Sequence, residues 1–266
     1  MKAIVCVKQV PDTSGKVAVK ADGTLDRASM ATITNPDDLN ALEAALKLKD
    51  ETGCEVVVVT MGPPPAEGML RELLARGADK AVLVSGREFG GSDTFATSQI
   101  LAAAVNKIGV GPEDVVFCGR QAIDGDTAQV GPQIAEKLHL PQITYAADIT
   151  KDGNTLSVKR MLEDGYMTIK AQTPCLITCI KELNTPRYMS VSGVFECYAK
   201  PMKVLDYEAL KDHPLIDATT IGLKGSPTNI LTSFTPPQKG AGQMLEGNDM
   251  ATCEKLAGIL LEKHII

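Results

Sequence analysis

Four short apolar runs occur in the first 120 residues, and stretches with helical spacing follow them. The runs are "AIVCV" at 3–7, "EVVVVT" at 55–60, "KAVLVS" at 80–85 and "DVVFCG" at 114–119. Each run is continuously apolar and rich in β-branched residues, whereas a strand with one wet face alternates apolar and polar positions. The pattern therefore predicts parallel strands that are buried on both faces.

The intervening stretches repeat apolar residues at helical spacing. Leu39, Leu42 and Leu46 share one face of a helix for which Asn35 is a suitable N-cap and Gly53 a suitable end. Further helices are predicted within residues 64–80, 92–109 and 126–140. Alternating strands and helices predict an α/β fold with a doubly wound, mostly parallel, Rossmann-like sheet and right-handed crossovers.

The pattern changes after about residue 141. Asp164 and Gly165 lie between two alternating runs, which predicts a β-hairpin at about 155–172, and "CLITCI" predicts a strand that rejoins the sheet. From residue 184 the chain has too few apolar residues for a core of its own and ends in a short helical pattern. We therefore divide the chain into an α/β domain at 1–183 and an extended arm at 184–266. The arm leans either on this domain or on a partner chain.

Composition and charge exclude several classes of function. The net charge of −6 and the aromatic content of 4% argue against binding to nucleic acid. No apolar stretch approaches the length of about 20 residues that a membrane helix needs. The first apolar run is not followed by a signal-peptide cleavage site, so a cytoplasmic protein is expected.

The residue types that carry nucleophilic or metal chemistry are scarce. The chain has seven Cys, none in Cys-x-x-Cys spacing, and three His. This pattern argues against a zinc or iron–sulfur site and against a catalytic triad. No catalytic side chain is predicted.

The stretch "GRQAIDGDTAQVGPQIAE" at 119–136 follows the fourth apolar run directly. In doubly wound sheets, ligands bind beyond the carboxyl ends of the strands, where the strand order reverses. Asp126 is suited to cap the next helix, with Gln129 completing a capping box, and Gly125 and Gly131 leave room for a close ligand. A helix that starts there would have to kink or begin again at Pro132.

The loops at 8–13, 61–65 and 90–97 and the helix start at Asn35-Pro36 are predicted to share the same rim of the sheet. Small and polar loops around one helix N-terminus favour a nucleotide pocket, in which exposed amides bind phosphate. Independent tight turns are the alternative. An ATP-hydrolysing or adenylating enzyme would need a Gly-rich loop with an adjacent Lys, which "DGDTAQVG" lacks.

Several stretches, in order along the chain, resemble the beta subunit of electron transfer flavoprotein. They are "AIVCVKQVPDT", "NPDDLNALEAALKLKD", "GRQAIDGDTAQVGPQIAE", "VKRMLEDGYMTIKAQTPCLIT" and "LNTPRYMSVSG". The sequence departs from the family pattern at Met167, where Glu or Gln is usual, and at Val191 and Ser192, where many members have Leu-Pro. The resemblance implies a sheet of the adenine nucleotide alpha hydrolase-like type, with an inserted hairpin and a partner-binding arm.

The resemblance also implies a heterodimer with an alpha subunit that carries one FAD, and an adenine nucleotide in this chain. Ordinary members bind AMP there, whereas electron-bifurcating members bind a second FAD that accepts electrons from NADH. One electron then passes to ferredoxin or flavodoxin, and the other passes through the alpha-subunit FAD to an acyl-CoA dehydrogenase. "KQVPDT" and "DTFAT" resemble the bifurcating branch more closely; a structural AMP is the alternative.

The resemblance assigns roles to particular positions of this sequence. The adenylate would be held by Cys6, Lys8, Asn35, Met61, Gly62, Asp124, Gly125, Asp126, Thr127, Gln129, Val130 and Gly131. In a bifurcating member the flavin would border Asp12, Asp93, Thr94 and Thr97. "LNTPRYMSVSG" resembles the loop that docks on the dehydrogenase, and it supplies Pro186, Arg187, Tyr188, Met189, Ser190 and Val191. The alpha subunit would take up the arm.

Overall fold

The computed structural model describes residues 1–12, 31–228 and 240–266, and most of its strands belong to one sheet. The strands of this sheet are β1 (Lys2–Cys6), β4 (Glu55–Met61), β5 (Lys80–Val84), β6 (Val115–Gly119), β7 (Gln142–Asp152), β8 (Thr155–Met161), β9 (Tyr166–Gln172), β10 (Cys175–Cys179) and β11 (Met202–Leu205). Within the described residues the sheet has nine strands, in the order β11-β5-β4-β1-β6-β10-β7-β8-β9. All pairs from β11 to β7 are parallel, and β8 and β9 are antiparallel.

The four predicted strands are confirmed as β1, β4, β5 and β6, the centre of the sheet. Every residue of β6 is buried, and the interiors of the other three strands are buried as well. Strand order runs outward from β1 in both directions, through β4 and β5 on one side and β6 on the other. The doubly wound prediction is therefore correct, and the order reverses between β1 and β6.

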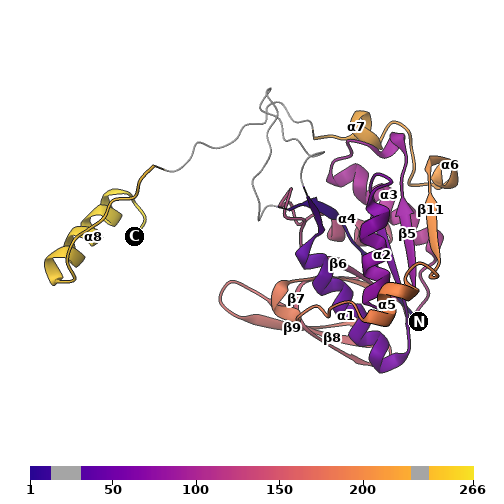
Figure 1. Ribbon diagram of the computed structural model, residues 1–266, viewed down its shortest axis with the longest axis horizontal. Coiled ribbons are helices and arrows are strands. Elements are labelled where there is room, and N and C mark those ends of the chain that lie inside the picture. The colour runs from indigo at the N-terminus through magenta and orange to yellow at the C-terminus, as the bar shows by residue number, and fades with distance from the viewer. Residues whose placement is uncertain (13–30, 229–239) are drawn as a thin grey trace.

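Helices cover both faces of the sheet (Figure 1). Helices α1 (Pro36–Thr52) and α2 (Ala66–Arg76) pack on one face, and α3 (Thr94–Ile108) and α4 (Val130–Lys137) pack on the other. The predicted end of α1 is confirmed, because Gly53 has a φ of 71°, a left-handed conformation that favours glycine. Short 3₁₀ helices, η1 (Arg87–Phe89) and η2 (Lys181–Leu183), follow β5 and β10.

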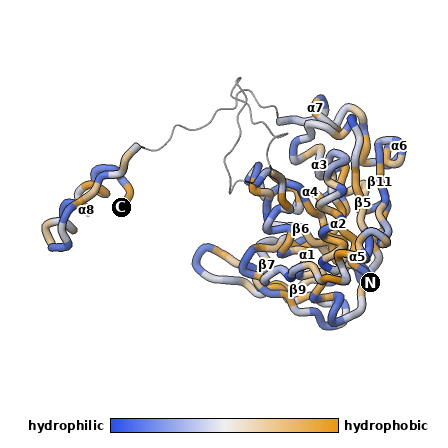
Figure 2. The backbone as a smooth tube through the Cα atoms, viewed as in Figure 1, coloured by the Kyte–Doolittle hydropathy of each residue, from blue (hydrophilic) through white to orange (hydrophobic). Residues whose placement is uncertain are grey.

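The predicted hairpin is β8 and β9, and β10 rejoins the sheet between β6 and β7 as expected. The structure adds β7, a long strand that starts in the parallel sheet and continues into the antiparallel ribbon. A register shift between Ala146 and Asp148 interrupts the alternation of its more buried and more exposed positions, which explains why the sequence pattern did not indicate the strand. Figure 2 shows the projecting end of this ribbon as hydrophilic.

A separate pair of strands, β2 (Gln9–Pro11) and β3 (Thr32–Thr34), lies beyond the end of β1. The two strands are antiparallel and flank residues 13–30, which lie outside the described residues. Thr13 of the predicted 8–13 loop belongs to that undescribed stretch.

The first part of the arm packs on the α/β domain. Strand β11 pairs with β5 at the edge of the sheet, and Leu205, Leu210, Ile216 and Ile221 are buried in the same core cluster as α3. Three short helices belong to this part: α5 (Val191–Glu196), α6 (Tyr207–Leu210) and α7 (Gly222–Gly225). These residues thus lean on the chain's own core, one of the two predicted alternatives.

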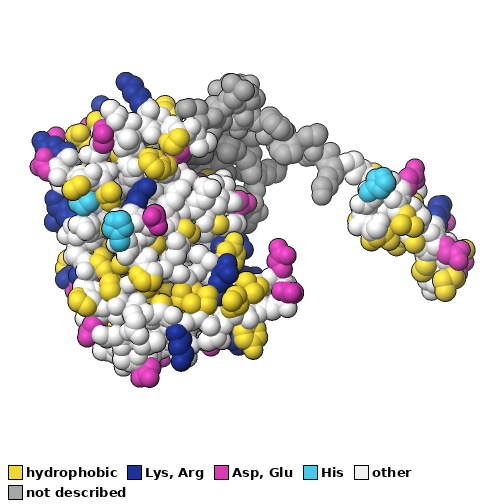
Figure 3. Space-filling view, turned by 180° about the vertical axis from the view of Figure 1, so that it is seen from behind, with side chains coloured by type: hydrophobic (Ala, Val, Ile, Leu, Met, Phe, Trp, Pro, Cys, Tyr) yellow, Lys and Arg dark blue, Asp and Glu magenta, His cyan; other side chains and the backbone are white. Residues whose placement is uncertain are grey.

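The end of the arm is different. Helix α8 (Met250–Glu262) contains no buried residue and lies apart from the sheet in Figure 1. Figure 3 shows hydrophobic side chains on its surface. Residues 229–239 of the arm lie outside the described residues. Within the described parts of the chain, no helix combines the length and apolar content of a membrane span.

Candidate functional site

The carboxyl ends of β1 and β6 lie side by side where the strand order reverses. Cys6 at the end of β1 pairs in register with Cys118 of β6. Lys8 follows shortly after β1, and Gly119 is the last residue of β6. Doubly wound sheets bind their ligands beyond strand ends of this kind, in the region that we call the crevice. The structure therefore confirms the predicted location of the 119–136 stretch at this rim.

A buried carboxylate joins the two strand ends. Asp38, in the first turn of α1, is only 7% exposed. Its Oδ2 accepts a hydrogen bond from the Lys8 backbone N–H at 2.8 Å, and its Oδ1 accepts one from the Gly119 N–H at 3.0 Å. Sequence reasoning missed this residue, because an Asp in the first turn of a helix is already explained by the helix dipole.

Burial dominates the electrostatics around Asp38. It raises the pKa of this carboxyl to about 7, although the N–H groups of Lys8 and Gly119 stabilise the charged form. Burial also raises the pKa of Asp37, against the opposing charge of Arg120, whose Nε lies 3.4 Å from the Asp37 carboxylate. The start of α1 thus presents two carboxyls of raised pKa beside the crevice.

Asn35 fixes the loop that follows β6. It occupies the N-cap position of α1 as predicted, but its side chain makes no cap hydrogen bond. Instead its Nδ2 donates to the carbonyl oxygen of Gln121 at 2.8 Å, and its Oδ1 accepts from the Ile123 N–H at 3.1 Å. The side chain is fully buried, so it holds two points of the loop in place.

Two further contacts tie this loop to its surroundings. Lys8 Nζ lies 2.7 Å from the Asp124 carboxylate, and Thr94 Oγ1 donates to Gln129 Oε1 at 3.0 Å. Together with Asn35, these four residues were all predicted to hold a cofactor, and the structure brings them together. Their segments lie far apart in the sequence, so only the fold unites them.

The predicted capping box is wrong. Helix α4 begins at Val130 with Gln129 as N-cap, and no side chain caps it. Asp126 Oδ1 instead accepts a hydrogen bond from Gln121 Nε2 at 2.7 Å. Because the helix starts late, Pro132 lies within its first turn, where an N–H has no intrahelical partner to lose. Neither a kink nor a second start is needed.

The loop contains left-handed backbone at residues other than glycine. Asp126 has a φ of 49° and Ala128 a φ of 52°. Residues other than Gly, Asn and Asp seldom adopt this backbone conformation, so it is strained at Ala128. Backbone strain of this kind is concentrated at functional sites. The surrounding hydrogen bonds hold the loop in this form.

The two glycines of the loop have different roles. A Cβ on Gly125 would meet nothing within 4 Å, so this position leaves open space, as predicted. A Cβ on Gly131 would lie 2.8 Å from Thr178 Cγ2 and 3.4 Å from Cys118 Cβ. The prediction that Gly131 makes room for a ligand is therefore wrong, because this glycine allows α4 to pack on the sheet.

Not every backbone N–H group of the loop is open to a ligand, because two of them already have a partner in the chain. The N–H groups of Gly125 and Asp126 donate to the Ala122 carbonyl at 3.2 Å and 2.9 Å. Among the described residues, the N–H groups of 127–131 donate to no backbone carbonyl. The amides open to a phosphate therefore begin at Thr127 and run into the first turn of α4, Val130 included.

The remaining predicted cofactor residues lie on neighbouring elements. Met61 ends β4 and Gly62 follows it; the Gly62 N–H donates to the carbonyl oxygen of Val84, the last residue of β5, at 3.0 Å. Thr97 is half-buried in α3. The Asp12 N–H donates to Ala31 at 2.8 Å, next to the undescribed residues 13–30.

Asp93 has a structural role. Its Oδ1 accepts from the Ala96 N–H at 3.0 Å and caps α3, while its Oδ2 accepts from the Thr228 N–H at 2.9 Å. Burial opposes ionisation of this carboxyl, but the hydrogen bonds outweigh it and lower its pKa. Asp93 thus ties the arm to α3, and both its oxygens already have partners in the chain.

Of the predicted partner-binding residues at 186–191, Pro186 and Arg187 are half-buried and the other four are exposed. Tyr188 and Val191 are 92% and 79% exposed, and Met189 is also exposed. Ser190 caps α5 by accepting from the Gly193 N–H at 2.9 Å. Pro186 precedes Arg187, whose side chain turns back toward the carboxylate of Glu43.

A doubly wound, mostly parallel sheet with a fixed, partly strained loop at its switch point defines an α/β protein of the Rossmann-like class. Residues 22–208 match the family model described as electron transfer flavoprotein domain. The chain therefore belongs to the electron transfer flavoprotein family, and the relatives below place it with the beta subunits.

The similarity to these relatives extends over the whole chain. The chain is 69% identical to the acryloyl-CoA reductase electron transfer subunit gamma of Anaerotignum propionicum, and the match covers 100% of both chains. It is 51% identical to the caffeyl-CoA reductase-Etf complex subunit CarD of Acetobacterium woodii, again with both chains covered completely. It is 47% identical to the electron transfer flavoprotein subunit beta of Clostridium acetobutylicum, over 100% of both chains.

Proposed function

We propose that this chain holds an FAD with its adenylate in the crevice between β1 and β6, and that NADH donates the electrons. The observation that carries the proposal is the 119–131 loop, which Asn35 and Lys8 fix at the switch point. Next to this fixed backbone, Gly125 leaves open space, and within the described parts of the chain the amides of 127–131 have no backbone partner. This combination fits a phosphate-bearing adenylate.

The bound FAD would supply the redox chemistry, and the chain would bind and orient it. Lys8, paired with Asp124, and Thr94, paired with Gln129, would hold the walls of the crevice. Cys6 would form part of its floor at the end of β1. Gly125 would allow the cofactor to approach the backbone closely.

The destination of the electrons is proposed from the relatives. Two of them are named for acyl-CoA reductases, acryloyl-CoA and caffeyl-CoA. We infer that one electron from each NADH pair reaches an acyl-CoA dehydrogenase of this kind through the alpha-subunit FAD. The second electron passes to ferredoxin or flavodoxin. The exposed stretch at 186–191 is the proposed docking site for the dehydrogenase, and the exposed helix α8 is the proposed contact with the alpha subunit.

The alternative is a structural AMP in the same crevice, with electrons confined to the alpha subunit. The same loop supports this alternative, because both ligands share the adenylate. The experiment is to purify the heterodimer, extract its ligands, and identify and count them by mass spectrometry. Two FAD per heterodimer is the expected result; one FAD with one AMP would contradict bifurcation and leave the nucleotide site standing.

A further inference from the structure

The chain carries a row of exposed apolar side chains on residues 186–198, which we name the recognition segment. Tyr188, Val191 and Phe195 are 92%, 79% and 78% exposed. Exposed apolar side chains gathered in this way mark a surface that binds another protein. The segment is short, so its shape depends on the elements beneath it.

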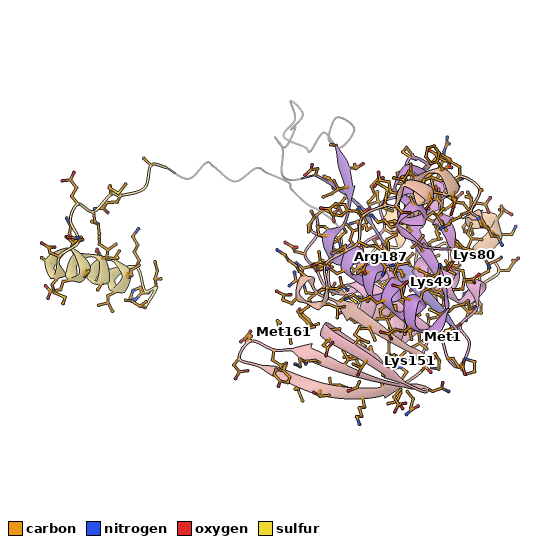
Figure 4. The ribbon with its side chains drawn as sticks, turned by 60° about the horizontal axis from the view of Figure 1, so that its bottom comes forward. Met1, Lys49, Lys80, Lys151, Met161 and Arg187 are labelled. Atoms are coloured by element: carbon orange, nitrogen blue, oxygen red, sulfur yellow. The ribbon has the colours of Figure 1, made fainter. Side chains whose placement is uncertain are left out.

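Arg187 lies within this segment but turns away from its surface. Its Nε and Nη2 donate to the two carboxylate oxygens of Glu43 at 2.9 Å and 3.0 Å, and Nη2 also donates to Asp50 at 2.7 Å. The Arg187 backbone N–H donates to Glu43 Oε2 as well, at 2.9 Å. Glu43 is 5% exposed in the middle of α1. In Figure 4, Arg187 lies on the side of the sheet that carries α1.

Helix α2 holds the same segment from the other side. The Arg187 carbonyl accepts a hydrogen bond from Arg76 Nη1 at 2.5 Å, and the Cys197 carbonyl accepts one from Arg71 Nη1 at 3.0 Å. A Cβ on Gly193 would lie 2.2 Å from the Ala75 carbonyl oxygen, so α5 rests directly on the end of α2. The segment is therefore fastened near both of its ends and in its middle.

We propose that Arg187 is a positioning residue, which together with Glu43 holds the recognition segment in the shape that the acyl-CoA dehydrogenase binds. This inference rests on the proposed function, in which the segment docks on that dehydrogenase. Arg187 itself does not contact the partner, because its guanidinium is already engaged by two carboxylates of α1. The sequence analysis counted Arg187 with the partner-binding residues, and the proposal gives it an indirect part in that binding.

The physical basis is preorganisation. A loop that must be ordered on binding loses conformational entropy, whereas a loop held in its bound shape does not. The forked guanidinium can bridge Glu43 and Asp50 at once, which the point charge of a Lys cannot do. The two neighbouring carboxylates raise the pKa of Arg187, so the bridge keeps its charge.

The test compares Glu43→Gln and Arg187→Lys in the heterodimer, with an acyl-CoA dehydrogenase that the wild-type heterodimer reduces. Glu43 is buried and cannot contact a partner, and its replacement leaves the charge of Arg187 in place. Both variants should raise the KM for the dehydrogenase about tenfold, which corresponds to about 1.4 kcal/mol. The kcat and the nucleotide content should stay unchanged. Glu51→Gln, the same substitution at an exposed position of α1, is the matched control.

A second measurement separates positioning from contact. Because Arg187 acts through the segment, Phe195→Ala combined with Glu43→Gln should raise KM by less than the product of the single effects. Amide hydrogen exchange in residues 186–198 should become faster in Glu43→Gln, while exchange in β1 and β6 stays the same.

The outcomes distinguish the positioning role of Arg187 from the docking role of the recognition segment. An unchanged KM in Glu43→Gln beside a raised KM in Arg187→Lys would mean that Arg187 touches the partner, and the positioning role would be overturned. Multiplicative effects with Phe195→Ala would overturn it as well. If Tyr188→Ala and Phe195→Ala both leave KM unchanged, the segment is not the docking site, and it is the proposed function that fails.

Discussion

The carboxylate of Asp38 accepts a hydrogen bond from the backbone N–H of Gly119 at 3.0 Å, although 81 residues separate them. The same carboxylate binds the N–H of Lys8. One buried side chain at the start of α1 therefore holds the ends of both strands that form the crevice. The shape of the proposed nucleotide site depends on this link as much as on the loop itself.

Gly119→Ala should disrupt the link. The new Cβ would lie 2.3 Å from Asp38 Oδ1 and 2.8 Å from the backbone of α1. We expect a loss of about 3 kcal/mol in the free energy of unfolding, together with a loss of bound nucleotide. Denaturant unfolding and ligand extraction measure the two effects. Gly68→Ala is the control, because its Cβ meets nothing within 4 Å and should stabilise α2 by about 0.5–1 kcal/mol.

Asp38 should make stability depend on pH. Its pKa is about 7 in the folded chain and lower in the unfolded chain, where burial is lost. The folded state therefore binds the proton more tightly, and the stabilisation from this group is complete below about pH 4 and lost as the pH rises through 7. Asp38→Asn does not titrate, so the stability of wild type relative to the variant should fall between about pH 4 and 7 and level off above. A difference that grows with pH would contradict this assignment.

Gly125→Val and Gly131→Val should separate ligand space from packing space. At Gly125 a side chain meets no protein atom within 4 Å. The nucleotide-free chain should therefore keep its stability within about 0.5 kcal/mol while it loses the nucleotide. At Gly131 the side chain meets Thr178 and Cys118, and the cost should be about 1–3 kcal/mol even without ligand. Full nucleotide content in Gly125→Val would place the ligand elsewhere.

Asp93→Ala and Asp126→Gly should differ in their effect on stability. Asp93 caps α3 and binds the Thr228 N–H, so its loss should cost about 1 kcal/mol or more. Among the described residues the Asp126 side chain caps no helix and accepts from the Gln121 side chain, and Gly tolerates the left-handed φ of this position, so Asp126→Gly should cost under about 0.5 kcal/mol. Thermal unfolding of the two variants at equal nucleotide occupancy makes the comparison. Equal losses would restore the capping box that the sequence predicted.

Which segments of the chain lie next to one another in the fold could be predicted only in part. The rim loops could be grouped from the sequence, because parallel strands place their carboxyl ends at one edge. The bonds of Asn35 to Gln121 and Ile123 could not be predicted, because an Asn before a helix is already explained as a cap. The inward turn of Arg187 was hidden for a related reason, since Glu43 has no sequence feature that marks it as buried.

The local pattern could be predicted from the sequence: continuous apolar runs indicate strands covered on both faces, and Asp164-Gly165 indicates a tight turn. These features follow from side-chain burial and backbone geometry within a few residues, so they can be read along the chain. Tertiary structure alone decided where α4 begins, why Gly131 is small, and that β11 closes the edge beside β5. Each of these depends on atoms supplied by a distant segment, and such contacts leave no pattern in the neighbouring residues.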